Sequence, residues 1–357
     1  KAMQAAMEVN GTAAEKSAAA RNAAKSALAK SLGKTKVSNM ELNNFINDGA
    51  KNAVGDAMKA CMESTTNITD QQKCRSTSAK DTLAKSLGKA TVTQTDVELF
   101  IRKGAQEKAM EAMKAATSTN GTTMKERKAA VKEALKAALG KSDITNTKLE
   151  EFIEDGAKTA VKGAMAACVA SADSITDAAA KREKLVECRS TSARKALSKA
   201  LGKSDSNDVS KTEVESFVRN AAKTAVADAM KAALEDSTTN EAEKRQAVKQ
   251  ALAQSLGQSE IDDKSFEFFK KKGAEDALAD TMKSCVEAAK LQSTKSDVET
   301  AMKACAGDSA KEALKNALGS KNVTNADVKK FVQQAGKSSA VMSRKNCMKA
   351  AGSDAAE

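Results

Sequence analysis

The side chains best able to do chemistry in this chain are its seven cysteines, and six of them fall into pairs. The first member of each pair follows a phenylalanine at one constant spacing, as Cys61 follows Phe45, and the second member comes 13 to 20 residues later. Two further segments that follow a phenylalanine lack both cysteines and carry Ala116 and Ala233 where the first cysteine would stand. Because the members are present or absent together, the pattern predicts three disulfides. They are Cys61 with Cys74, Cys168 with Cys188, and Cys285 with Cys305.

These disulfides would affect both stability and location. A disulfide that closes a loop of about 15 residues stabilises a fold by about 3 kcal/mol in the chain-entropy model. Disulfides persist in oxidising compartments, so the pairs predict a secreted or extracellular protein. One alternative is that the cysteines are small apolar residues in a reducing cell. A metal site is a weaker alternative, because the sequence has no His and no Cys-x-x-Cys.

Cys347 follows Phe331 at the same spacing, but no later cysteine is present to pair with it. We expect it to pair beyond Glu357 in a longer chain, to form an intermolecular disulfide, or to remain a free thiol. The opening residues 1–12, KAMQAAMEVNGT, align with EAMKAATSTNGT at Glu111–Thr122. We therefore expect the sequence to be a processed or truncated piece of a longer tandem array.

Several side chains needed for common chemistries are missing. The 357 residues include no His, Pro, Trp or Tyr, and the eight Phe are the only aromatic residues. Without imidazole there is no catalytic triad and no His-ligated metal. Without Trp and Tyr the stacking surfaces that bind single-stranded nucleic acid are mostly absent. We therefore predict that the protein is not an enzyme, has no cofactor or metal site, and has no specific nucleic-acid partner.

The elements that position the cysteines are repeated along the chain. The pattern of Leu, three residues, Leu and Gly occurs six times. A Phe follows each Gly at one constant spacing, except in the fourth copy, where the interval is longer. The glycines are Gly33, Gly88, Gly140, Gly202, Gly257 and Gly319, and the phenylalanines are Phe45, Phe100, Phe152, Phe217, Phe269 and Phe331. Six copies at nearly constant spacing indicate a tandem repeat.

Each copy predicts two helices, which we name helix A and helix B. Helix A ends at the glycine, because glycine adopts the left-handed conformation of a helix C-cap at little cost. Helix B carries the phenylalanine and begins at a capping residue three positions before an acidic residue. The predicted capping boxes are Ser38 with Glu41, Thr93 with Asp96, Ser210 with Glu213, and Thr324 with Asp327. Thr145 and Asp262 are predicted to be simple caps.

Helix B carries a stripe of small and apolar residues at intervals of four. Small residues allow a neighbouring helix to approach closely. The methionines fall mainly on this stripe, among them Met58, Met110, Met113 and Met165. We expect them to pack in the core, with a lipid-binding groove as the lesser alternative.

The predicted fold is all-α, built from tandem helix pairs of about 52–65 residues each. Because a single pair cannot bury its apolar face, the pairs must stack, either as an elongated solenoid-like rod or as a string of small helical bundles. The expected boundaries are a tail of a preceding repeat at 1–12, followed by repeats at 13–66, 67–120, 121–173, 174–238, 239–290 and 291–357.

The surface suggests two further features. Asn10, Asn67, Asn120 and Asn322 begin Asn-x-Ser/Thr sequons and are candidate glycosylation sites in a secreted protein. The formal net charge is +12, which would suit a polyanion partner, but both signs are mixed along the chain as on an ordinary solvated surface. No stretch is apolar enough for a transmembrane segment.

These features predict a structural or scaffolding protein. Its alanine-rich, disulfide-linked helices would form a rod that associates with itself or with other chains of the same assembly, as a secreted fibre, matrix or surface layer. The alternative is a secreted helical binding module that holds a lipid or a polyanion.

Overall fold

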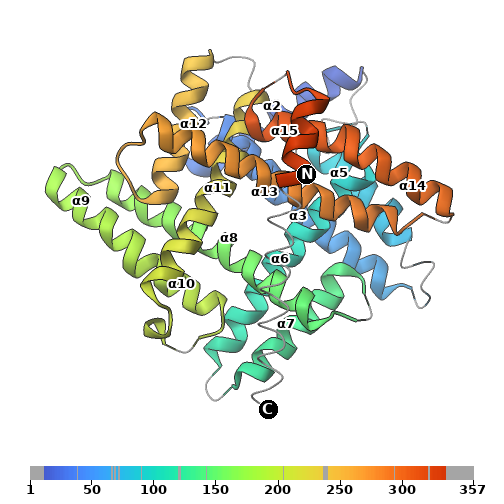
Figure 1. The fold of residues 1–357 in the computed structure, drawn as a ribbon, viewed down its shortest axis with the longest axis horizontal. Coiled ribbons are helices and arrows are strands. Elements are labelled where there is room, and N and C mark those ends of the chain that lie inside the picture. Colours follow the sequence, from blue (N-terminus) through green and yellow to red (C-terminus); the bar gives the residue numbers. More distant parts are fainter. Residues whose placement is uncertain are drawn as a thin grey trace. The chain divides into compact units, whose positions relative to one another are not determined.

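The computed structural model describes residues 12–37, 39–65, 67, 70, 73–89, 91–119, 122–141, 143–203, 205–235, 240–292, 294–320 and 322–334. Within these ranges the regular elements are helices and no strand occurs (Figure 1), which confirms the all-α prediction. The chain falls into two compact units. One comprises Lys1–Ala105, Ala137–Gly140 and Thr281–Ser309, and the other comprises Gln106–Lys136, Lys141–Asp280 and Ala310–Glu357.

Each predicted helix of the repeat is present. The helical segments that precede the six C-cap glycines, and so form all or the last part of each helix A, are α2 (Ala13–Leu32), α5 (Ala79–Leu87), α7 (Met124–Leu139), α10 (Ala193–Ala200), α12 (Glu241–Leu256) and α15 (Ala310–Leu318). The helices B are α3 (Asn39–Glu63), α6 (Gln94–Ser118), α8 (Asn146–Asp173), α11 (Lys211–Glu235), α13 (Asp263–Ala289) and the helical residues 325–334. A short 3-10 helix, η3 (Ser206–Asp208), lies in the long loop of the fourth copy.

The caps explain where these helices begin and end. All six predicted C-cap glycines have positive φ angles, between 56° and 69°, which L-residues with a side chain adopt only with strain. The capping boxes predicted at Thr93, Ser210 and Thr324 are formed, as are the simple caps at Thr145 and Asp262. Ser38 lies outside the described residues.

The second cysteine of each pair begins a π-helical turn. These turns are η1 (Cys74–Ser78), η2 (Cys188–Ser192) and η4 (Cys305–Ser309). They lead directly into α5, α10 and α15, and two of them follow α9 (Ala178–Glu187) and α14 (Lys295–Ala304). In α7 and α12, which lack a cysteine, the helix is continuous over 16 residues. The π turn therefore accompanies the cysteine and is not a general property of helix A.

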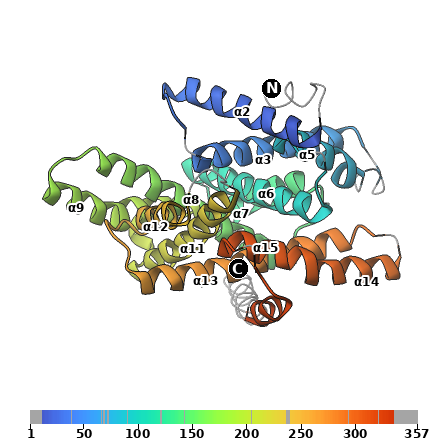
Figure 2. The same cartoon turned by 90° about the horizontal axis from the view of Figure 1, so that it is seen from above.

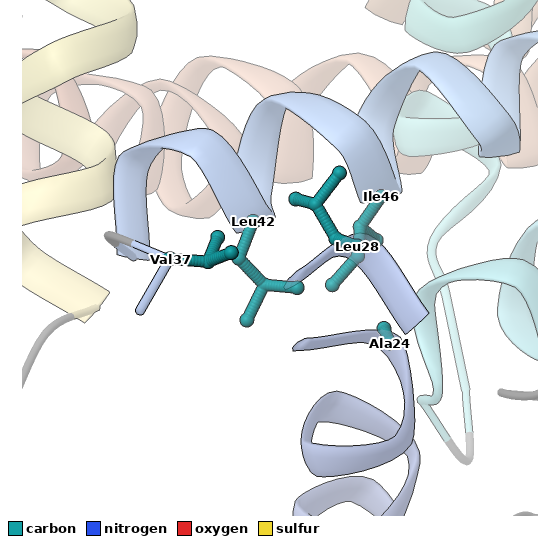
Figure 3. Packing of buried hydrophobic residues seen from close by; sticks show 5 residues of the cluster. All are labelled: Ala24, Leu28, Val37, Leu42 and Ile46. Carbon is teal, nitrogen blue, oxygen red and sulfur yellow. The ribbon is translucent and has the colours of Figure 1, made fainter. Parts of the chain in front are cut away.

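The first helix pair shows how one repeat builds its own core. Leu28 of α2 packs with Leu42 and Ile46 of α3, and Ala24 and Val37 complete the cluster (Figure 3). All five are at most 6% exposed. This cluster joins the two helices of one pair, as the apolar face of helix A predicts.

Among the described helices, however, the most extensive packing joins a helix B to the helix A that follows it, in three cases. The pairs α3 with α5, α8 with α10, and α11 with α12 form antiparallel hairpins of this kind, and α3 and α5 lie side by side in Figure 2. Cys61 and Cys74 link α3 to the turn before α5, and Cys168 and Cys188 link α8 to the turn before α10, whereas α11 and α12 contain no cysteine. The repeat boundaries given above remain predictions, but the hairpin of B with the next A is the unit that packing defines.

Thr95 contacts a copy that is three positions later in the sequence. Thr95 Oγ1, at the start of α6, lies 3.7 Å from Cys285 Sγ and 3.9 Å from Cys305 Sγ. Thr95 belongs to the second copy and Cys285 to the fifth. In a linear solenoid each repeat contacts only its neighbours, so this part of the fold does not follow that rule.

Candidate functional site: disulfide hairpins and repeat contacts

The structure places the three predicted cysteine pairs at disulfide distance. Their Cα–Cα separations are 5.6, 5.5 and 5.7 Å in chain order, within the range for disulfides. The second cysteines, which begin the π turns, are at most 4% exposed. Ser192 Oγ donates a hydrogen bond of 3.4 Å to Cys168 Sγ. Each link therefore joins the end of a helix B to the buried start of the next helix A.

The C-cap glycine of helix A contacts a helix B from two copies earlier. A Cβ atom placed on Gly257 would lie 3.0 Å from Met165 Cε, and one on Gly140 would lie 3.2 Å from Met58 Cε. Gly202 faces Met113 and Gly319 faces Met230 in the same way. Every one of these methionines stands at the same distance along the sequence from the phenylalanine of its helix B. The same contact therefore occurs four times in one register.

These methionines pack in the core. Met58 and Met165 are 0% exposed, Met113 is 1% exposed and Met230 is 8% exposed. A flexible thioether fills the space that the absent glycine side chain leaves. The core-packing interpretation of the methionine stripe therefore holds at these positions, and they are not available to line a lipid groove.

A second recurring contact joins successive helices B. In each case the glycine stands four residues after the phenylalanine of its own helix B. It faces a backbone carbonyl of the preceding helix B, six residues after the phenylalanine of that helix. A Cβ on Gly156 would lie 3.2 Å from Gln106 O, one on Gly273 would lie 2.5 Å from Lys223 O, and one on Gly104 would lie 3.8 Å from Lys51 O. The predicted close approach of small-residue stripes occurs at these three crossings.

Polar contacts also connect successive helices B. Gln106 of α6 donates to Asp155 of α8 at 3.1 Å, and Lys162 of α8 pairs with Asp228 of α11 at 2.5 Å. Lys158, which is 22% exposed on its side chain, pairs with Asp155. Burial alone would lower the pKa of Lys158, but the carboxylates of Asp155, Glu154 and Asp280 raise it above its ordinary value.

Sequence reasoning missed a row of arginines that connects successive helices A. Arg75 Nη1 donates to Leu139 O at 3.1 Å, and Arg127 Nη1 donates to Gly202 O at 2.6 Å. Arg189 lies against Gly257, where an added Cβ would be 2.7 Å from its Cγ. Each arginine reaches the C-terminus of the next helix A, where a cation is favoured by the helix dipole. The available signal was the spacing, since each arginine stands at the same distance along the sequence from the glycine that ends its own helix.

Arg75 also forms a buried ion pair. Its guanidinium pairs with Glu98 of α6, and the Nε–Oε1 distance is 3.2 Å. The two side chains are 7% and 2% exposed. Gln94 Nε2 donates to Glu98 Oε1 at 3.4 Å and to Arg75 O at 3.3 Å. This network is structural in character, because each buried charge has a partner of opposite charge.

Of the four sequon asparagines and the unpaired Cys347, the structure describes two asparagines. Asn67 and Asn322 are exposed, and Asn67 Nδ2 donates to Asp70 Oδ2 at 2.6 Å. Asn10, Asn120 and Cys347 lie outside the described residues. In the described part of the chain, no group of three or more Cys, Asp or Glu side chains is arranged to hold a metal ion. Within that same part, every helix is too short or too polar to cross a bilayer.

No family model, curated protein or solved structure matches this chain.

Proposed function

We propose that the protein is a non-enzymatic scaffold whose disulfide-linked helical repeats stack in register and associate into an extracellular fibre, matrix or surface layer. The observation that carries this proposal is the repeated contact between the C-cap glycine of one copy and the methionine of a helix B two copies earlier. A contact that recurs in one register makes each copy a similar building block, which is the basis of solenoid and array proteins.

The buried polar groups support the same proposal. Arg75 and Arg127 bond to the carbonyl ends of neighbouring helices. These side chains hold repeats together and are not directed at a small molecule. Thr95 beside Cys285 indicates that copies three apart also meet, so the proposed stacking combines contacts between successive copies with contacts between copies two and three apart.

The disulfides support an oxidising location. Three pairs with Cα–Cα distances of 5.5–5.7 Å fit secretion, because cytosolic proteins rarely retain such bonds. We propose that the exposed sequons at Asn67 and Asn322 are available for glycosylation in that location.

The binding-module alternative has less support. A lipid cavity lined by the methionine stripe would need side chains that are buried against glycines here. For a polyanion, the two lysines that directly follow the C-cap glycines Gly33 and Gly202 are each engaged by a carboxylate: Lys34 pairs with Glu41 at 2.6 Å and Lys203 pairs with Glu213 at 3.6 Å.

The test combines mass and assembly. Chain folded under oxidising conditions is analysed by intact mass spectrometry with and without reductant, and by sedimentation over a range of concentrations. We expect three disulfides per chain and species larger than the monomer. Free thiols throughout and a monomer at every concentration would contradict the proposal, and salt-sensitive retention on heparin would then favour the polyanion alternative.

A further inference from the structure

Helix A of the fourth copy carries a run of positive charge that no acidic residue interrupts. Between Glu187 and Asp205 the sequence has no Asp or Glu. The basic residues of that stretch are Arg189, Arg194, Lys195, Lys199 and Lys203. They lie in one compact unit, in η2, α10 and the loop that follows. Glu213 pairs with Lys203, so we define the basic ridge as the other four residues, Arg189, Arg194, Lys195 and Lys199.

The protein does not neutralise the charges of the basic ridge. Lys195 and Lys199 are exposed, and neither has a carboxylate or hydrogen-bond partner within the described ranges. Arg189 is exposed as well, and it lies against Gly257 without an acidic partner in those ranges. Arg194 is half-buried, and its Nε atom has no hydrogen-bond partner among the residues that the structure describes. The ridge therefore keeps its full positive charge.

Other copies balance the same stretch of helix A with an acid. Lys195 stands seven residues before its C-cap glycine, and the second, third and sixth copies have Asp81, Glu133 and Glu312 at that place. Glu133 pairs with Lys136 on α7 at 2.8 Å. The fourth copy therefore has a base where three other copies have an acid, and the uninterrupted charge is not a property of the repeat in general.

The spacing of the two lysines is unfavourable for the helix itself. Lys195 and Lys199 are four residues apart on α10, so they project from one face and lie about one turn apart. Two like charges at this spacing destabilise a helix. The helix dipole favours Lys199, which lies in the last turn, but gives no such benefit to Lys195. An ordinary solvated face explains this pair less well than a surface that binds an anion, because a bound anion removes the repulsion.

The residues of the ridge fit a chain of anionic groups. The planar fork of arginine donors binds sulfate, phosphate or carboxylate groups with two hydrogen bonds, and lysine adds a point charge. At about 1.5 Å per residue, the helical stretch from Arg189 to Lys199 is about 15 Å long. One small anion cannot contact both ends of that stretch, whereas a linear polyanion can.

Two further observations favour an acidic polysaccharide over a nucleic acid. From Ala178 to Ser204 the chain has no aromatic residue, so it offers no surface on which unpaired bases could stack. The basic ridge also begins directly after Cys188, whose disulfide with Cys168 fits an oxidising location. A partner in that location lies outside the cell, where acidic polysaccharides are the abundant polyanions.

We propose that the basic ridge binds an acidic polysaccharide, with Lys195 and Lys199 on its anionic groups and Arg189 and Arg194 beside them. This inference goes beyond the scaffold role, because it gives the protein a partner that is not a protein. It does not depend on self-association, since every ridge residue belongs to one chain. A scaffold that carries such a site would link its own assembly to a polysaccharide matrix.

The test measures the affinity of the full oxidised chain for a fluorescent heparin oligosaccharide over a range of NaCl concentrations. The double variant Lys195→Glu with Lys199→Glu should bind about tenfold or more weakly and show a smaller salt dependence, because two charge contacts are lost. The matched control is Lys80→Glu with Lys85→Glu on α5, where Asp81 stands between the two lysines. It makes the same change in net charge and should lower the affinity much less.

The comparison of the two double variants decides the result. Equal losses of affinity would show that only net charge matters and would overturn the inference, as would no binding by the unmodified chain at about 0.15 M NaCl. Tighter binding of duplex DNA than of heparin at the same salt would overturn the choice of a polysaccharide. A selective loss in the ridge variant supports the inference whether the chain is monomeric or assembled, so its outcome is separate from that of the scaffold proposal. Circular dichroism verifies folding, and Lys195→Gln with Lys199→Gln takes the place of a ridge variant that does not fold.

Discussion

Glycine at the end of each helix A is required for two separate physical reasons. Its left-handed φ angle would strain any residue with a side chain, at a cost of about 1–2 kcal/mol. In the later copies the missing side chain also makes room for methionine. Gly33 lacks the second requirement, because no atom lies within 4 Å of a Cβ added there.

The two requirements can be separated by matched substitutions. Gly202→Ala should lower the free energy of unfolding by the cost of a strained φ angle plus about 1–3 kcal/mol for overpacking against Met113. Gly33→Ala has a similar φ angle and should show only the strain. Urea denaturation of the two variants measures the difference, and equal losses would show that the methionine contact is not tightly packed.

The buried charge pair gives a second prediction at this scale. Arg75→Met should destabilise the protein by about 3–5 kcal/mol, because it leaves the Glu98 carboxylate buried without its guanidinium. Replacing both residues, with Arg75→Met and Glu98→Leu, should recover most of that loss. A double-mutant cycle measured by denaturant unfolding tests this, and additive losses would contradict the pairing.

At the scale of the element, the helices begin and end at capping residues that lie within three positions of their partners in the sequence. Thr123 donates from its backbone and its hydroxyl to Glu126 Oε2, at 2.7 and 2.9 Å, and the Glu126 N–H donates back to Thr123 Oγ1. The backbone bond first, and then the side-chain bond, lowers the pKa of Glu126 below its ordinary value. A carboxylate held in this way stabilises the fold above its unfolded pKa.

That stabilisation should disappear as the pH falls through the lowered pKa of Glu126. Glu126→Gln keeps an acceptor oxygen but cannot titrate, so its melting temperature should fall less between pH 5 and pH 3 than that of the unmodified chain. Thermal unfolding followed by circular dichroism at both pH values measures this. Glu183→Gln, at an exposed position on α9, is the control. An identical pH dependence in the Glu126 variant would contradict the cap.

The hairpin that a disulfide closes is the next element to test. Cys168 and Cys188 are 20 residues apart, and a loop of that size corresponds to about 3 kcal/mol of stabilisation. The double change Cys168→Ser and Cys188→Ser should therefore lower the denaturation midpoint clearly. Cys347→Ser, which leaves all three pairs intact, should not. Equal midpoints for the double variant and the unmodified chain would show that the bond adds no stability.

At the scale of the whole molecule, local patterns were predictable and contacts between copies were not. The glycine C-caps and the helix pairs follow from short spacings within one copy, and the cysteine pairing follows from a short spacing across the connection to the next copy. Gly202 meets a methionine from two copies before its own, and no spacing within a copy indicates that choice. The arginine row was visible as a repeated spacing but had no assigned partner, because its acceptor is a backbone carbonyl of the next copy. Thr95 beside Cys285 depends on folding over 190 residues of separation, which repeat periodicity does not encode.

The π turn at the second cysteine has a consequence for how these repeats could have multiplied. A π turn holds one residue more than an α turn, and one residue corresponds to about 100° of rotation in an α-helix. The side chains of α9, which precede the turn at Cys188, are therefore rotated about the helix axis relative to those of α10, which follow it. In α12, which has no π turn, the side chains keep one α-helical phase from end to end. Arg75 and Arg189, inside two of these turns, nevertheless stand as far from their C-cap glycines as Arg127 does in the continuous α7, so the turn forms without an inserted residue between arginine and glycine. Gaining or losing the cysteine pair during duplication would therefore change the face presented before the second cysteine and leave the face after the turn in register.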